Sequence, residues 1–209
     1  TPLHDPFCGS GTIPVEAALY AHNIAPGFGR RFALENLLIY NADRAKKIRI
    51  AEAENIRTDV ETRITGSDID SAAVERAKLN AEHACVAAGR ALQEIGCDSR
   101  IPRPDFIQSD FTELEAPFDA GLLLCNPPYG ERLGDEAEAE LLYKRMSCLF
   151  KNFPGWEIGV ITPHLKFQEC IGKHAALLKD IKAGNLDTKF YIYSDKVGSK
   201  PQHKVHEKK

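Results

Sequence analysis

The sequence has no long apolar run, because none of its hydrophobic stretches approaches the roughly 20 residues that a helix needs to cross a bilayer. Its first residues, Thr1 to Asp5, also lack the basic start and apolar core of a signal peptide. Both absences argue against membrane-spanning and exported proteins. We therefore expect a soluble, cytoplasmic protein with no membrane partner.

The cysteines lack the close, repeated spacing of zinc sites and small disulfide frameworks, since neither a Cys-x-x-Cys pair nor a nearby Cys/His tetrad occurs. A chain of 209 residues can also build a core without covalent staples. We therefore expect reduced, mostly buried thiols and no metal site. The six cysteines are Cys8, Cys85, Cys97, Cys125, Cys148 and Cys170.

Neither sign of charge dominates, because 27 Lys and Arg against 30 Asp and Glu give a formal charge of −3. The surface as a whole is not built to attract a polyanion. Any contact with nucleic acid must come from a local patch or from a part of the protein outside this chain. Hydrophobic residues at 43% and charged residues at 27% are ordinary for a globular chain, and the length favours one domain.

Strand-like and helical segments alternate along most of the chain. The expected strands lie at 3–7, 63–68, 104–111, 118–125 and 157–162, and helices are expected from residue 13 and at 71–88, 141–150 and 165–171. Residues 175–182 and 188–193 can pair as a hairpin through residues 183–186. The alternation predicts an α/β fold with a mainly parallel seven-stranded sheet that ends in an antiparallel hairpin.

Two segments stand apart from this alternation. Residues 25–63 form a charged insertion, irregular at first and helical from 44 to 62; its mixed charges are typical of a solvated helix face, with an RNA-facing surface as the alternative. Residues 195–209 are polar and basic, which predicts a mobile tail or a segment that continues. We expect one domain over residues 1–194. Its opening inside the first strand indicates a piece cut from a longer protein.

The first candidate binding loop is Asp5-Pro6-Phe7-Cys8-Gly9-Ser10-Gly11-Thr12, between the first strand and the first helix. Small residues let a ligand approach the backbone, and the following helix offers free N–H groups. Two phosphate-binding motifs fail here: Thr12-Ile13 stands where a P-loop needs Lys followed by Ser or Thr, and Pro14 stands where the dinucleotide motif needs a third glycine. A ligand loop and a purely structural tight turn both stay open.

Carboxylates follow the second and third expected strands. Asp68 is placed to accept hydrogen bonds from ribose hydroxyls, Ile69 to pack on an adenine face, and Asp70 to cap the next helix. The alternative for Asp68 is a second helix cap. After the third strand, Asp110 can accept a hydrogen bond from an exocyclic amine, with the ring of Phe111 beside it.

The most informative segment is Asn126-Pro127-Pro128-Tyr129, directly after the strand at 118–125, which is apolar enough to be buried on both faces. The two prolines restrict the backbone and remove N–H donors. The amide oxygen of Asn126 and the carbonyl of Pro127 then form a pair of acceptors for one –NH2 group, and Tyr129 can stack on a base. A turn or a short polyproline ligand is the alternative.

In this order and spacing, these segments resemble those of the S-adenosylmethionine-dependent methyltransferases with a Rossmann-like class I fold that modify exocyclic amines. The resemblance runs from Thr1 to about Tyr193 and leaves out much of the insertion. More narrowly, the chain is similar to the branch that carries a THUMP RNA-binding domain upstream and methylates the 2-amino group of guanine in 23S ribosomal RNA. Gly130-Glu131-Arg132-Leu133, after the tyrosine, points to this branch.

The resemblance implies a role for each matching position. The methionine end of S-adenosylmethionine would meet the glycine turn, at Asp5, Cys8, Gly9, Ser10 and Gly11. The ribose would meet Asp68, and the adenine Ile69, Asp110 and Phe111. Asn126 and Pro127 would hold the target amine, with Asn126 also beside the cofactor, and Tyr129 would stack on the base.

Two features of the branch are missing from this chain: the THUMP region, and the strand and helix that precede the glycine turn. Specificity for RNA would therefore come from an N-terminal THUMP domain outside this chain. Methylation of adenine N6 in DNA or RNA is the alternative activity, because Asn-Pro-Pro-Tyr also serves that amine. A module that binds nucleotide or RNA without catalysis is the third hypothesis.

Overall fold

The computed structural model describes residues 1–129, 136–183 and 186–194. Its centre is a seven-stranded sheet in the order β3-β2-β1-β4-β5-β7-β6. The strands β1 to β5 pair in parallel, and β7 runs antiparallel to both β5 and β6. The expected mainly parallel sheet with a terminal hairpin is thus confirmed. The strands are β1 (Leu3–Asp5), β2 (Ile64–Asp68), β3 (Asp105–Gln108), β4 (Leu122–Cys125), β5 (Glu157–Thr162), β6 (Leu177–Ala183) and β7 (Leu186–Tyr193).

The helices follow the expected order with different ends. Helix α3 runs to residue 94 instead of 88, because its apolar stripe continues through Ala88, Ala91 and Leu92, all buried. The helix expected at 141–150 is two helices, and the Ser147 hydroxyl donates to the Lys144 carbonyl (2.7 Å) where the first ends. The helices are α1 (Thr12–Ala21), α2 (Ala42–Glu54), α3 (Ser71–Glu94), α4 (Glu136–Met146), α5 (Leu149–Asn152) and α6 (Phe167–Ile171), with 3-10 turns η1 (Ala33–Asn36) and η2 (Phe111–Glu113).

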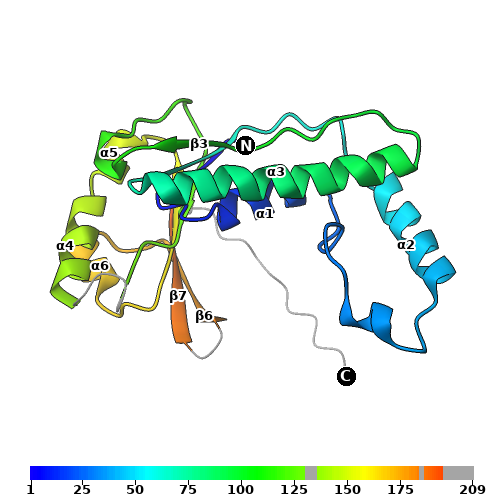
Figure 1. Cartoon of the computed structure of the whole chain (residues 1–209). Coiled ribbons are helices and arrows are strands. Elements are labelled where there is room, and N and C mark those ends of the chain that lie inside the picture. The colour runs from blue at the N-terminus through cyan, green and yellow to red at the C-terminus, as the bar shows by residue number, and fades with distance from the viewer. Residues whose placement is uncertain (130–135, 184–185, 195–209) are drawn as a thin grey trace, which may run out of the picture.

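Helices cover both faces of the sheet, as the alternation of side chains along β4 shows. Leu122 packs on the cluster that includes Ala18 of α1, whereas Leu123 points into the larger cluster that includes Tyr143 of α4. In Figure 1, α1 and α3 accordingly lie together, apart from α4, α5 and α6. The carboxyl ends of the parallel strands are left for the connecting loops.

The strand expected at 118–125 begins only at Leu122. A Cβ on Gly121 would lie 2.6 Å from the Trp156 ring, and the Trp156 indole N–H donates to the Phe118 carbonyl (2.8 Å). The bend before β4 is therefore shaped around this tryptophan. Burial on both faces is also only partly correct, because Leu122 and Leu124 are half-buried, while Leu123 is fully buried.

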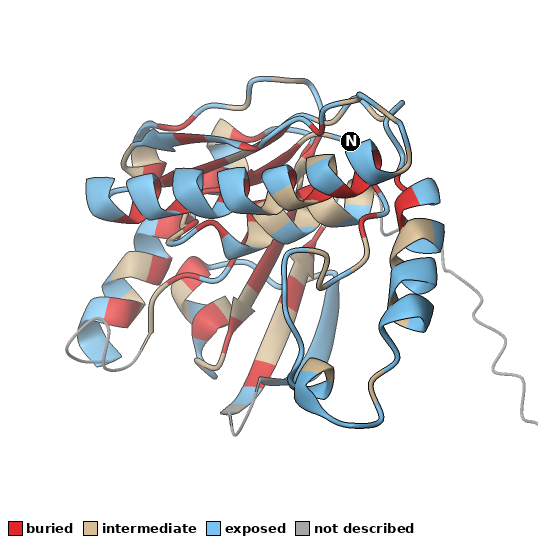
Figure 2. Ribbon diagram, turned by 45° about the vertical axis from the view of Figure 1, so that its right-hand side comes forward, coloured by how far each residue is buried: buried red, intermediate tan, exposed pale blue. Residues whose placement is uncertain are grey.

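The charged insertion extends along one side of the domain, outside the layers of the sheet and its helices (Figure 2). Figure 2 shows α2 at its side, exposed along most of its length, and Ala53 is the one buried residue of this helix. The helix ends at Glu54, earlier than residue 62, and most of its residues are exposed. A solvated face and an RNA-facing surface both remain predictions for it. No helix in the described ranges combines the length and apolar character needed to span a membrane.

Three expectations fall outside the described residues. They concern the centre of the hairpin turn at Gly184-Asn185, the segment Gly130 to Leu133, and the tail at 195–209. The strand pairing of Ala183 with Leu186 closes the hairpin on either side of the first of these.

Candidate functional site

Four loops with polar or small residues meet at one edge of the sheet. β1 lies between β2 and β4, so the strand order reverses there, and ligands of open parallel sheets bind outside the carboxyl ends at such a reversal. The glycine turn follows β1, Asp68 ends β2, Asp110 comes two residues after β3, and Asn126 follows β4 directly. The topology therefore gathers the loops that the sequence singled out.

Asp5 shapes the start of the glycine turn from inside the protein. Its side chain is buried (1% exposed), and its carboxylate accepts a hydrogen bond from the Phe7 N–H (3.0 Å). Burial raises the pKa of this carboxyl to about 7. Burial likewise raises the pKa of the Cys8 thiol to about 12, so this cysteine is not a reactive thiolate at neutral pH. A contact from Asp5 to a cofactor stays a prediction.

Both glycines of the turn have positive φ, but their surroundings differ. Gly11 (φ 82°) lies against α3, where a Cβ would come within 2.9 Å of the Ala77 Cβ and 3.0 Å of the Phe106 ring. Gly9 (φ 53°) has no atom within 4 Å of the place a Cβ would take. Gly11 thus satisfies a packing requirement, and Gly9 leaves space beside the backbone for a ligand.

Asp68 ties the glycine turn to the next loop. Its carboxylate accepts hydrogen bonds from the N–H of Gly9 (2.9 Å) and of Asp70 (3.0 Å). Two oxygens offer about four acceptor positions, so capacity remains for ribose hydroxyls. Asp70 caps α3 through the Ala72 N–H (2.8 Å), as expected. Ile69 is 67% exposed and presents apolar surface at this edge.

Asp110 and Phe111 are held by an arginine that the sequence did not indicate. The Asp110 carboxylate accepts from the backbone and hydroxyl of Thr112 (2.9 and 2.8 Å), and Arg145 of α4 donates to it (3.1 Å). The Thr112 N–H bond, followed by the Thr112 hydroxyl and Arg145, lowers the pKa of Asp110. Phe111 is buried, with its ring 4.9 Å from the Phe7 ring and 5.2 Å from the Arg145 guanidinium carbon. Adenine contacts from either residue stay predictions.

The acceptors proposed for the target amine follow β4. Asn126 is exposed and Pro127 is buried, and within the described ranges neither the Asn126 amide nor the Pro127 carbonyl has a hydrogen-bond partner. The next carbonyl, of Pro128, accepts from the buried Tyr143 hydroxyl (3.4 Å). Tyr129 is half-buried. The backbone here is thus fixed by α4, while the Asn126 amide makes no hydrogen bond to any residue that the structure describes.

Tyr143 and its partner Thr162 were not found from the sequence. Their hydroxyls lie 3.2 Å apart behind the Asn-Pro-Pro-Tyr loop. Tyr143 looks like an ordinary apolar position of an amphipathic helix, so no local signal marks it.

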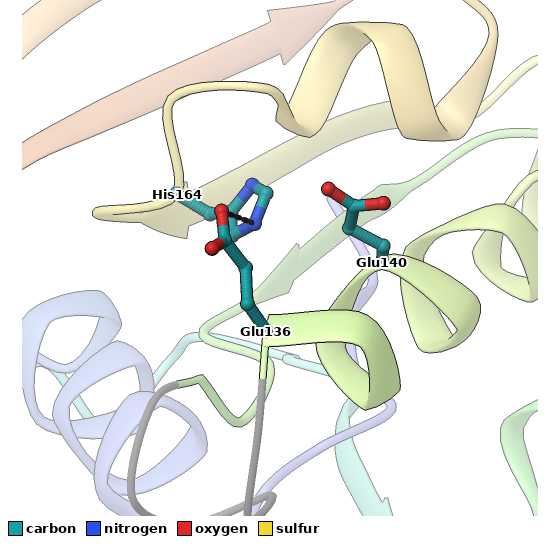
Figure 3. A group of neighbouring side chains, drawn as sticks. All are labelled: Glu136, Glu140 and His164. Atoms are coloured by element: carbon teal, nitrogen blue, oxygen red, sulfur yellow. Dashed lines mark ion pairs between the residues drawn. The ribbon is translucent and has the colours of Figure 1, made fainter.

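A polar cluster borders this loop. His164 follows β5, and its Nε2 lies 3.7 Å from a carboxylate oxygen of Glu136, while Glu140 faces both from the next turn of α4 (Figure 3). The ligand-type atoms of the three lie within 4.8 Å of one another. The ammonium of Lys166, however, lies 3.6 Å from Glu140 and 3.9 Å from Glu136, so a positive charge already pairs with both carboxylates. We assign no metal here.

Comparison with known proteins places the chain. The family model described as UPF0020, the RMKL-like methyltransferase domain, matches residues 1–192. Among curated proteins, the "Putative RNA methyltransferase YpsC" of Bacillus subtilis is 37% identical over 203 residues, which are 97% of this chain and 49% of that protein. The "Ribosomal RNA large subunit methyltransferase K/L" of Shewanella pealeana is 36% identical over 197 residues, 92% of this chain and 26% of that protein.

Solved structures with the same fold are also described as methylases or methyltransferases. A possible methylase from Clostridium difficile 630 superposes with a TM-score of 0.76 at 31% identity, over 97% of this chain and 49% of that one. The structure described as "SMU.472, a putative methyltransferase complexed with SAH" superposes with a TM-score of 0.75 at 29% identity, over 93% of this chain and 48% of that one. A predicted N6-adenine-specific DNA methylase from Listeria monocytogenes superposes with a TM-score of 0.72 at 35% identity, over 92% of this chain and 46% of that one.

The chain belongs to the RMKL-like methyltransferase domain family. It spans about half the length of the Bacillus relative and about a quarter of the Shewanella relative.

Proposed function

We propose that this domain transfers a methyl group from S-adenosylmethionine to an exocyclic amine of an RNA base, and specifically to the 2-amino group of guanine in 23S ribosomal RNA. One observation carries the chemistry: the Asn126 amide, which has no hydrogen-bond partner among the described residues, follows β4 at the strand-order reversal, on a backbone fixed by two prolines and by Tyr143. The Bacillus relative is named an RNA methyltransferase and the Shewanella relative a large-subunit ribosomal RNA methyltransferase, which supports ribosomal RNA as the substrate.

The residues at the edge of the sheet fit the cofactor. Gly9 leaves room beside the turn, Asp68 has acceptor capacity at the end of β2, and Ile69 exposes apolar surface. When bound, S-adenosylmethionine supplies an electrophilic methyl group on a positively charged sulfur. Ser10 and Cys8 complete the proposed methionine end. The complex of SMU.472 with SAH supports a cofactor of this class.

The chain's own contribution is to orient the amine. The Asn126 amide oxygen and the Pro127 carbonyl would each accept one amine hydrogen, which turns the nitrogen lone pair toward the methyl donor. Such positioning contributes up to roughly 7–11 kcal/mol in favourable cases. Tyr129 would stack on the base, which must leave its helix or already lie in a loop. No strong base is needed before attack, because the methylated ammonium is acidic and loses its proton afterwards.

Substitution of Asn126 by Ala tests the central role. We expect Asn126→Ala to abolish methyl transfer and to leave S-adenosylmethionine affinity within a few fold, measured by calorimetry. Asn55→Ala, an exposed asparagine on the insertion, is the matched control and should retain full activity. Equal loss of turnover and cofactor affinity in Asn126→Ala would refute the assignment.

The acceptor base is decided by a second experiment. The Listeria structure is described as a predicted N6-adenine-specific DNA methylase, so adenine is the competing target. Mass spectrometry of nucleosides from ribosomal RNA, taken from cells with and without the full-length protein, should show loss of N2-methylguanosine. Unchanged N2-methylguanosine with loss of N6-methyladenosine would replace guanine by adenine. We further propose that a THUMP domain elsewhere in the longer protein selects the RNA site.

A further inference from the structure

A strongly basic hollow lies at the base of the charged insertion, away from the methyl-transfer edge. Its volume is about 270 Å³, and four of its nine lining residues are arginines. The loop at 28–31 contributes two of them, α2 contributes one and α3 contributes one. They are Arg30, Arg31, Arg49 and Arg90. This local concentration contrasts with the formal charge of −3 of the whole chain.

Two of these arginines build the hollow. Arg49 donates to the carbonyls of Phe28 and Arg30 (both 3.2 Å), which fixes the loop against α2. Arg31 pairs with Glu35 (3.3 Å), and the same carboxylate lies 3.9 Å from Arg49. Gly29 brings the loop so close to α3 that a Cβ there would lie 3.1 Å from Ala87. The wall is therefore held in place by packing and hydrogen bonds.

The other two arginines are available to a ligand. Arg30 and Arg90 are exposed, and in the described part of the chain neither guanidinium has a carboxylate within ion-pairing distance. They come from separate elements, the loop and α3, on the same hollow. The nearest acidic lining residue is Glu94, one turn along α3 from Arg90.

We propose that this hollow binds backbone phosphates of the substrate RNA through Arg30 and Arg90. This inference rests on RNA being the substrate, as in the proposed function. Guanidinium groups bind phosphate oxygens in pairs of hydrogen bonds, and unpaired arginines on a fixed frame are suited to this. An adjoining groove of about 480 Å³ shares Arg30 with the hollow and reaches Ser10 and Thr12 of the glycine turn. It gives an RNA strand a continuous path between the hollow and the site.

The contact would set affinity and register, not base choice. Along α3, Arg90 lies 19 residues from Ser71 at the cofactor edge, roughly 28 Å at 1.5 Å per residue. Phosphate contacts at such a distance position the RNA and carry no sequence information directly.

The test measures RNA binding by the full-length protein, separately from methyl transfer. The double variant Arg30→Ala/Arg90→Ala is titrated with a 23S ribosomal RNA fragment between 50 and 200 mM KCl. We expect about tenfold weaker binding at low salt, and a slope of log Kd against log salt that is smaller by about 1 to 2, as for two lost phosphate contacts. S-adenosylmethionine affinity should stay within twofold.

The matched control removes the same charge elsewhere. Arg57→Ala/Arg103→Ala deletes two exposed arginines that are already paired, with Asp59 (3.6 Å) and Glu82 (3.4 Å). It should leave RNA affinity within twofold. An equal loss in both double variants would show general electrostatics, and an unchanged affinity in Arg30→Ala/Arg90→Ala would show that the hollow does not bind the RNA. Either result overturns this inference alone. Absence of RNA binding by the unaltered protein would overturn the proposed function as well.

Discussion

Gly9 and Gly11 lie two residues apart in one turn, but packing restricts only Gly11. Both have positive φ, but only at Gly11 would a methyl group collide with α3. The sequence shows two glycines and cannot rank them, because the neighbour of Gly11 is Ala77, 66 positions further along the chain.

Alanine at these positions separates the two constraints. We expect Gly11→Ala to lower the free energy of unfolding by about 2–4 kcal/mol, the sum of left-handed backbone strain and overpacking. Gly9→Ala should cost only about 1 kcal/mol, because the space is open and its φ lies within the allowed left-handed region. Urea unfolding measures both, and equal losses would contradict the packing role of Gly11.

Asp5 makes the free energy of unfolding fall as pH rises, whereas most carboxylates in folded proteins make it rise. Its pKa in the folded protein is raised to about 7 by burial, whereas an unfolded Asp titrates near its ordinary value of 3.8. The folded state therefore holds more protons between about pH 4 and pH 7, and stability falls as pH rises through this window. Asp5→Asn removes the titrating group and can still accept from the Phe7 N–H.

We expect the stability of Asp5→Asn relative to the unaltered protein to grow with pH from 4.5 to 7.5. The gain should approach roughly 1.4 kcal/mol per pH unit and level off above pH 8. The pKa of buried His4 is lowered to about 4, so its protonation in acid lowers the free energy of unfolding. Both proteins retain His4, and its contribution therefore cancels in the comparison. A stability difference independent of pH, measured by urea unfolding, would show that Asp5 is already charged in the fold.

At the scale of elements, the loop after β4 depends on the helix that follows it. Tyr143 of α4 donates to the Pro128 carbonyl and contacts the Thr162 hydroxyl, so α4 and β5 together hold the backbone beside Asn126. The sequence alone assigns this rigidity to the two prolines. The tertiary contact adds a restraint on the direction of the loop, which proline does not supply.

Removal of one hydroxyl tests this restraint. Tyr143→Phe should cost about 1 kcal/mol of stability, as for a buried hydrogen bond, and should lower kcat while leaving S-adenosylmethionine affinity within twofold. Tyr193→Phe is the control, because Tyr193 is buried, its hydroxyl donates to the Lys173 carbonyl (3.3 Å), and it pairs with Ile158, at the other end of β5 from Thr162. It should show a similar loss of stability without loss of kcat. A kcat of Tyr143→Phe equal to that of Tyr193→Phe would remove the positioning role.

For the whole molecule, burial is uneven. The cluster around β4, β5 and α4 contains fully buried side chains such as Leu123, Val160 and Met146, whereas α2 contributes a single buried alanine. The insertion is joined to the body mainly through α3, and Leu38 on it is fully exposed. Regions with few buried apolar contacts open without global unfolding.

Native-state hydrogen exchange should reveal this difference. We expect amides of α2 to exchange through openings at least about 2 kcal/mol less costly than those of β4 and β5. Mass spectrometry of peptides from Ala42–Glu54 and Glu157–Thr162 provides the comparison. Equal protection in both peptides would mean that the insertion folds in one cooperative unit with the sheet.

The strands, helices and candidate loops were predictable because their signals are local. Hydrophobic spacing marked all seven strands, and small or polar residues at their ends marked Asp68 and Asn126. The start of β4 was misplaced, since the bend before it depends on Trp156, which lies far along the chain.

The sequence by itself determined the alternation of elements and the residues available at each strand end, because each depends on neighbours within a few positions. Only the tertiary structure decided the strand order, the pairing of Arg145 with Asp110, the hydrogen bond from Tyr143 to Pro128, and the position of Arg30 and Arg90 in the lining of one hollow. Each of these joins residues distant in sequence. Their proximity is fixed by packing of the whole chain, and no local pattern encodes it.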